Sequence, residues 1–146
     1  FDAAYRKLVE QMVGALLQVA PELQIHIEDR FVSFKEMSEE FNFADCILAP
    51  YIGFMGSSGI IGHACMHRRP LIACREGLLG ELVLQLGLGG VVNPRDASAF
   101  AGVLKRAVQG GLELDRSAAE GYVAQASSIS FGRALIEGWV LPEVND

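Results

Sequence analysis

Short apolar runs that alternate with amphipathic helical segments are the feature that most limits how this chain can fold. Three runs have the composition of strands buried on both faces of a sheet, at residues 45–50, 70–74 and 90–92. Segments with helical spacing separate and follow these runs, at residues 60–67, 77–86 and 97–108. Strands that alternate with helices form a parallel sheet covered on both faces. The sequence therefore predicts an α/β fold, a Rossmann-like three-layer sandwich with a parallel sheet.

Further elements are expected on both sides of this alternating region. Helical spacing predicts helices at residues 3–19, 34–43, 116–126 and 130–140, and alternation predicts a short strand at residues 23–27. Ser33 and Glu36 form a capping box for the second of these helices. No internal repeat or long linker divides the chain, so we expect residues 1–146 to form a single domain. Because the chain opens at Phe1 directly in helical spacing, we expect it to be a piece of a longer polypeptide.

Composition excludes two classes of partner. The 146 residues are 51% hydrophobic, which is enough for one core. The chain has 12 Lys and Arg residues against 18 Asp and Glu residues, which gives a net charge of −6. Because proteins that bind nucleic acids neutralise phosphates with basic side chains, we do not expect this chain to bind nucleic acid. Gly, Pro or charged residues interrupt every apolar stretch before the roughly 18 residues that a membrane helix needs. With no signal-peptide pattern at the start, we expect a cytoplasmic protein without a membrane span.

The cysteines and histidines do not form a metal-binding pattern. Cys46, Cys65 and Cys74 are an odd number at irregular spacing in apolar sequence, which indicates buried free thiols in a reducing compartment. His63 and His67 share one face of a helix, but no carboxylate accompanies them as it does in zinc-protease helices. We therefore expect no metal site.

The most suggestive motif is the glycine- and serine-rich segment at residues 53–59. It follows the first buried run and opens a helix, and in open parallel sheets ligands bind beyond the carboxyl ends of strands. Glycines allow close backbone approach, serines add hydroxyl donors, and a helix start offers free N–H groups to a phosphate. Similar turns also occur in folds that bind nothing. The segment lacks the lysine of a nucleotide-binding P-loop and the spacing of a dinucleotide fingerprint.

An ordered series of motifs carries a family resemblance. The series comprises residues 44–51, Gly56-Ser57-Ser58-Gly59, Ala64, residues 69–73, Gly77, residues 80–83, 87–89 and 92–96. It resembles the carboxyl-terminal domain of glycosyltransferases with two Rossmann domains, the GT-B type, and within them the group-1 family that includes sucrose- and glycogen-synthase-like enzymes. The resemblance covers residues 29–108. It implies that this chain is half of a GT-B architecture.

What the resemblance implies is a donor-binding domain for a nucleoside diphosphate sugar. Gly56, Ser57, Ser58 and Gly59 would hold the donor's diphosphate. The glycosyl group would pass to an acceptor held by a separate amino-terminal domain, and no cofactor is implied. The isolated domain would be inactive because the acceptor half is missing.

The sequence departs from the family at two positions where the family carries glutamates near the sugar and the ribose. Those positions are Met55 and His63 here. His63 can still donate to a ribose hydroxyl, whereas Met55 can replace neither a charge nor a hydrogen-bonding partner. Arg75 follows a strand's carboxyl end and is a candidate for a phosphate or sugar contact, with a solvated loop charge as the alternative. Arg68 and Arg69 precede a strand and are expected at the opposite edge.

Other functions remain open at this point. The loss of both glutamates would also fit a non-catalytic Rossmann-like binding or scaffolding module derived from the same fold. A weaker alternative is a fragment of a sugar-phosphate epimerase or kinase. The catalytic residues are not identified by the sequence.

Overall fold

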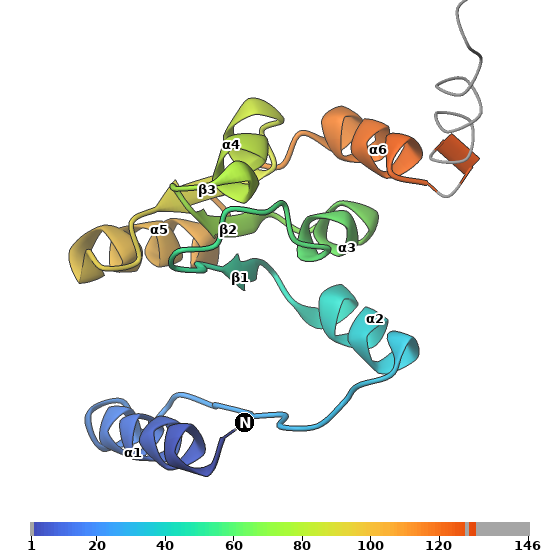
Figure 1. The fold of residues 1–146 in the computed structure, drawn as a ribbon. Coiled ribbons are helices and arrows are strands. Elements are labelled where there is room, and N and C mark those ends of the chain that lie inside the picture. Colours follow the sequence, from blue (N-terminus) through green and yellow to red (C-terminus); the bar gives the residue numbers. More distant parts are fainter. Residues whose placement is uncertain (1, 128, 131–146) are drawn as a thin grey trace, which may run out of the picture. The chain divides into compact units, whose positions relative to one another are not determined.

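A computed structural model describes residues 2–127 and 129–130 of the chain (Figure 1). The chain divides into two compact units, Phe1–Ser33 and Phe34–Asp146. All but the first residue of the helix predicted at residues 130–140 lies outside the described residues.

The first unit is built around helix α1, Ala3–Val19, which begins and ends where the sequence predicted. The Asp2 carboxylate accepts a hydrogen bond from the Ala4 N–H at 3.4 Å and so caps the first turn. Arg6 and Glu10, four residues apart, form an exposed ion pair of 3.2 Å that supports the helix. No helix within residues 2–127 and 129–130 combines the length and the apolar character needed to cross a membrane.

The prediction of a strand at residues 23–27 is wrong. The structure has no strand there, and Leu23, Ile25 and Ile27 are 44%, 39% and 43% exposed. Apolar residues that alternate with polar ones give an extended segment one apolar face. A strand also needs a neighbouring backbone that pairs with its N–H and C=O groups. In the structure this segment follows α1 as irregular chain without sheet pairing.

The second unit contains helix α2, Phe34–Phe43, and then alternating strands and helices, in the predicted order. The elements are β1 Ile47–Ala49, α3 Ile60–Met66, β2 Leu71–Cys74, α4 Leu78–Gln85, β3 Gly89–Val92, α5 Ala97–Val108 and α6 Arg116–Gln125. The strands form a three-stranded sheet in the order β1-β2-β3, and both pairings are parallel. The α/β class and the parallel sheet are thus confirmed, with a layout compatible with a Rossmann-like fold.

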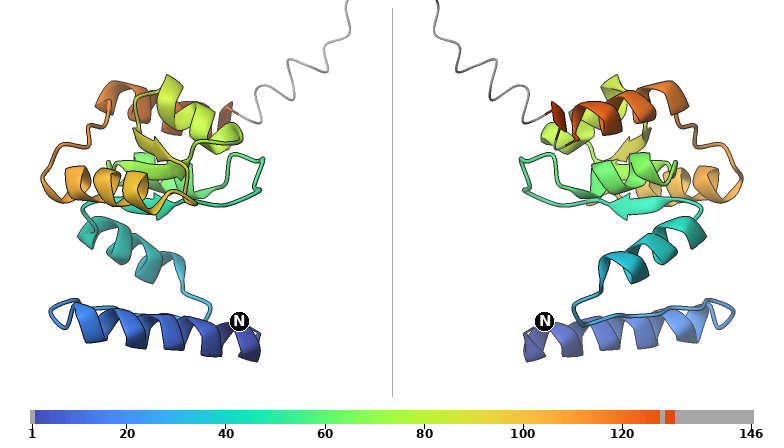
Figure 2. Two further views of the ribbon diagram at one scale, coloured as in Figure 1. Left: turned by 90° about the vertical axis from the view of Figure 1, so that its left-hand side faces the viewer. Right: turned by 90° about the vertical axis from the view of Figure 1, so that its right-hand side faces the viewer.

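Two clusters of apolar side chains cover the two faces of the sheet. Leu71 and Ala73 of β2 are fully buried in a cluster with side chains of α3, α4 and α6. Ile72, which points to the other face, packs with Val92 and with residues of α5. Figure 1 shows α3 and α5 on opposite sides of the strands, and Figure 2 shows α6 beside α3, against which it packs. Helices therefore form a layer on each side of the sheet.

The prediction that the first apolar run is buried on both faces is wrong, because Ala49 is the one residue of β1 that is buried and Ile47 is only half-buried. Leu48 in the middle of β1 is 46% exposed, whereas all four residues of β2 are buried. Leu48 pairs with Ile72 and therefore points to the face that α5 covers. Because β1 is an edge strand of the described sheet and α5 packs on β3, this helix does not bury Leu48.

Candidate functional site

Most of the site residues predicted from the sequence lie in the loops that follow the strands. We call the side of the sheet where the strands have their carboxyl ends the carboxyl edge, and the opposite side the amino edge. All three strands are parallel, so the loops at residues 50–59, 75–77 and 93–96 leave the sheet at one edge. Gly56 to Gly59 lie in the first of these loops, and Arg75 begins the second. This is the edge at which parallel α/β sheets bind their ligands.

The first two loops are held against each other by backbone contacts. The Leu78 N–H donates a hydrogen bond to the Met55 carbonyl oxygen at 3.3 Å. Gly77 has φ of +86°, and a Cβ atom at this position would lie 2.4 Å from the Phe54 carbonyl oxygen. The Tyr51 and Phe54 rings meet edge to face, with their centroids 5.6 Å apart. The glycine-rich loop is thus fixed against the loop that carries Arg75.

Within the glycine-rich loop, the segment before α3 leaves room for a ligand. A Cβ atom on Gly59 would have nothing within 4 Å, and the atoms nearest to one on Gly56 belong to the Phe54 ring, the first at 3.0 Å. Ser58 has φ of +57°, a conformation that residues other than glycine adopt rarely and that is enriched at functional sites. The Ser58 hydroxyl accepts the Ile60 N–H at 3.4 Å, while the Ser57 hydroxyl has no partner among the described residues.

Two guanidinium groups lie at the same edge. Arg75 follows β2 and Arg95 follows β3, and both residues are exposed. Within the described residues neither side chain makes an ion pair or a hydrogen bond. Arg95 is not among the residues predicted for the site from the sequence, although it follows β3 much as Arg75 follows β2. The edge therefore offers an anion two guanidinium groups that have no ion pair among the described residues.

Arg68 and Arg69 lie where the sequence predicted, before β2 and at the opposite edge. Arg68 pairs with Glu120 at 3.0 Å, and Arg69 donates to the Phe41 carbonyl oxygen at 3.1 Å and also to the Asn42 carbonyl oxygen. Both side chains are engaged within the protein, so neither belongs to the carboxyl-edge site.

His63 lies in a pocket that Arg75 does not line. It lines a mostly apolar pocket of about 380 Å³ between α3 and α6, and its ring centroid lies 5.5 Å from that of Phe41. The residues that line this pocket are Gly59, Gly62, His63, Met66, Val123, Ala126 and Ser127. The structure therefore brings His63 together with Gly59, and Arg75 is not part of the pocket.

His67 and Cys65, which lie close to His63 in the sequence, have structural roles. His67 Nδ1 lies 3.0 Å from Asn42 Oδ1, and His67 Nε2 lies 3.2 Å from Ser38 Oγ, so both ring nitrogens tie α3 to α2. Cys65 is buried, and this burial raises the pKa of its thiol. Nowhere in residues 2–127 and 129–130 do three or more His, Cys, Asp or Glu side chains gather as metal ligands would.

Comparisons of the chain with protein-family models, with curated proteins and with solved structures found no match. We therefore infer the site from the geometry of the carboxyl edge and from the motifs of the sequence.

Proposed function

We propose that the chain binds the diphosphate of a nucleoside diphosphate sugar at the carboxyl edge of its sheet. It would act as the donor-binding half of a GT-B glycosyltransferase of the group-1 type. The observation that carries this proposal is the glycine-rich loop, which is held against the loop that begins with Arg75, together with the guanidinium groups of Arg75 and Arg95 at the same edge, which have no ion pair among the described residues. The motif series described for residues 29–108 supports the choice of a nucleotide sugar among phosphate-bearing ligands.

Each group in this site has a defined part in the proposed binding. The Ser57 hydroxyl and the loop amides would donate hydrogen bonds to the phosphate oxygens, which glycine allows to approach the backbone closely. Arg75, and Arg95 beyond it, would neutralise the diphosphate through charge-assisted hydrogen bonds worth about 1.5–3 kcal/mol each. During glycosyl transfer the same groups would stabilise the diphosphate as it leaves with the electron pair of the broken sugar–oxygen bond. The acceptor would be held by an amino-terminal domain.

A second candidate function is a non-catalytic binding or scaffolding module on this fold. Met55 favours it, because this residue of the loop is 72% exposed and its thioether is only a weak hydrogen-bond acceptor in the place of a carboxylate. His63 also favours it, because its ring packs on Phe41 in the pocket between α3 and α6.

Calorimetric titration of the chain with UDP, GDP and ADP tests the proposal. We expect one of these nucleotides to bind with a Kd of about tens of micromolar, equivalent to roughly 6 kcal/mol. Gly59→Leu places a side chain in the open space of the loop, at a backbone φ of −62° that leucine adopts freely. We expect this variant to bind at least about tenfold more weakly than the wild type.

The matched control is Gly102→Leu, which adds the same side chain on α5 where nothing lies within 4 Å. It should bind the nucleotide as the wild type does. Failure of all three nucleotides to bind, or equal affinity of the wild type and Gly59→Leu, would contradict the proposal and favour the non-catalytic module.

A further inference from the structure

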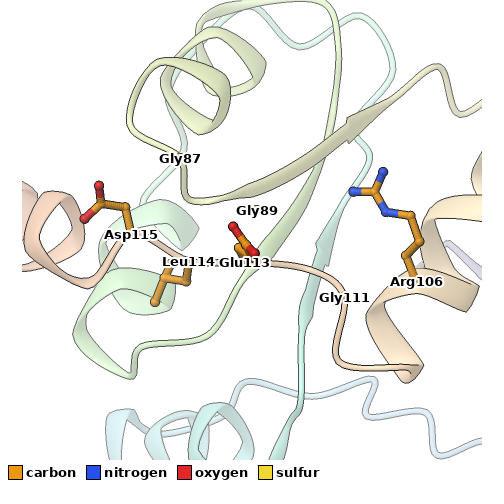
Figure 3. Close-up of a pocket in the computed structure, with 7 residues that line it drawn as sticks. All are labelled: Gly87, Gly89, Arg106, Gly111, Glu113, Leu114 and Asp115. Atoms are coloured by element: carbon orange, nitrogen blue, oxygen red, sulfur yellow. The ribbon is translucent and has the colours of Figure 1, made fainter.

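We propose a second ligand site, independent of the proposed function, at the amino edge of the sheet, for a small zwitterion that carries an ammonium group and a carboxylate. A pocket of about 580 Å³ lies there, beside the start of β3 (Figure 3). The residues that line it are Gly87, Gly89, Arg106, Gly111, Glu113, Leu114 and Asp115. Its volume lies within the range of small-molecule sites, roughly 300–1,000 Å³.

Backbone contacts fix the walls of this pocket. The Asp115 N–H donates to the Gly87 carbonyl oxygen at 2.8 Å, and the Gly111 N–H donates to the Arg106 carbonyl oxygen at 2.8 Å. Gly89 has φ of +143°, and a Cβ atom on it would lie 2.2 Å from the Leu71 carbonyl oxygen. The connection between α5 and α6 is thereby held at a set position beside β3. A pocket with fixed walls does not have to be ordered when the ligand binds.

Opposite charges face this pocket without neutralising each other. Figure 3 shows the Arg106 guanidinium on one side, with Glu113 and Asp115 on the other. Neither Arg106 nor Glu113 makes an ion pair or a side-chain hydrogen bond with another described residue. The Asp115 carboxylate, in contrast, has a structural role, because its Oδ1 accepts a hydrogen bond from the Ala118 N–H at 2.9 Å and caps α6. Arg106 and Glu113 are therefore the groups that a ligand would engage.

This charge pattern selects the class of ligand. A carboxylate would pair with the Arg106 guanidinium through two parallel hydrogen bonds, and an ammonium group would donate to the Glu113 carboxylate. A simple anion would meet the carboxylates of Glu113 and Asp115, and a simple cation would meet Arg106. Only a molecule with both charges satisfies both sides. Arg106 and Glu113 form no ion pair with each other, so we expect the two charges of the ligand to be separated by a spacer.

Calorimetric titration with a series of ω-amino acids tests this site. The probes are glycine, 4-aminobutyrate and 6-aminohexanoate, in which the distance between the two charges increases along the series. We expect one member with a spacer to bind with a Kd of about 1 mM or lower. Butanoate and butylamine, which carry one charge each, should bind at least about tenfold more weakly than that member.

Variants of the two charged residues connect the binding to this pocket. Arg106→Gln and Glu113→Gln should each weaken binding of the best probe at least about tenfold. Both side chains are exposed and make no ion pair or hydrogen bond with another described residue, so these variants should keep the wild-type melting temperature. Lys105→Gln, which makes the same charge change on the neighbouring exposed residue of α5, is the control and should bind normally. The site is refuted if no probe binds at about 10 mM, or if both pocket variants bind as the wild type does.

Discussion

Gly77 packs so closely against Phe54 that a Cβ atom on Gly77 would lie 2.4 Å from the Phe54 carbonyl oxygen. The contact joins the loop after β2 to the glycine-rich loop after β1. Two features require a glycine at this position: the close contact with Phe54 leaves no room for a side chain, and φ is +86°, in the region that favours glycine. The arrangement of the candidate phosphate site therefore depends on one residue without a side chain.

Replacing this glycine should strongly destabilise the protein. We expect Gly77→Ala to lower the free energy of unfolding by at least about 2 kcal/mol, because it adds a backbone clash to an unfavourable φ. Gly53→Ala is the matched control, since Gly53 has φ of +71° but nothing within 4 Å of its Cβ position. It should cost only about 1–2 kcal/mol. Equilibrium unfolding in urea measures both values, and equal losses would show that the contact with Phe54 is unimportant.

The end of α3 offers a substitution that should stabilise the fold. Arg68 has φ of +54°, and its N–H donates to the Cys65 carbonyl oxygen while the Arg69 N–H donates to that of Ala64. These two hydrogen bonds form a Schellman motif, in which glycine normally holds the position of Arg68. We expect Arg68→Gly to be more stable than Arg68→Ala by about 1 kcal/mol in thermal or urea unfolding.

Comparing glycine with alanine at the same position removes the Arg68 ion pair with Glu120 from the measurement. That pair is exposed at both ends, and we expect Glu120→Gln to change stability by less than about 1 kcal/mol. If alanine proves as stable as glycine at this position, the left-handed backbone at Arg68 is not strained.

Asp96 should stabilise α5 through its side chain. Its Oδ1 accepts the Ala99 N–H at 2.9 Å and so satisfies one of the free donors of the first turn. We expect Asp96→Ala to lower the free energy of unfolding by about 1 kcal/mol and Asp96→Asn to change it by only a few tenths. An alanine variant as stable as the wild type in urea would argue against the cap.

The three cysteines should differ in their reactivity. All are free thiols, and Cys65 and Cys74 are buried while Cys46 is half-buried. Burial raises the pKa of the Cys46 thiol, and the nearby Asp45 carboxylate raises it further. We expect iodoacetamide at pH 8 to label Cys46 first but more slowly than it labels the unfolded chain. Cys65 and Cys74 should react only when the protein unfolds, and rapid labelling of either in the native protein would contradict their burial.

The raised thiol pKa also gives a pH dependence. The folded-state pKa of Cys65 lies above its ordinary value of 9.0, so the fold favours the neutral thiol. Its contribution to stability is complete below pH 9 and is lost as the pH rises through the folded pKa, because the unfolded chain ionises first. In urea unfolding from pH 8 to 10.5, Cys65→Ala should lose less stability than the wild type. Identical losses in the two proteins would contradict this.

The order of elements after Phe34 could be predicted because each strand and helix there has its own local pattern. The short apolar runs gave β1, β2 and β3, and Asp96 marked the start of α5. The strand at residues 23–27 could not be decided in this way, since its pattern contains no information about a pairing partner. The exposure of Leu48 is likewise set by the position of α5, which no local pattern of β1 contains.

The positions of some candidate site residues could be predicted from the sequence, and those of others could not. Gly56 to Gly59 and Arg75 could be placed at the carboxyl edge because strand direction alone determines which loops meet there. The direction of the His63 ring depends on its packing with Phe41, and the contact of Gly77 with Phe54 joins two separate loops. Both are tertiary contacts that the spacing of residues does not encode.

Amide chemical-shift mapping during titration with UDP, GDP and ADP tests the carboxyl-edge site most directly. The account predicts that the largest shifts produced by the nucleotide that binds will fall on Gly56 to Gly59 and on Arg75. Shifts confined to the pocket at the amino edge, around Gly87 and Glu113, or no shifts with any of the three nucleotides, would contradict it.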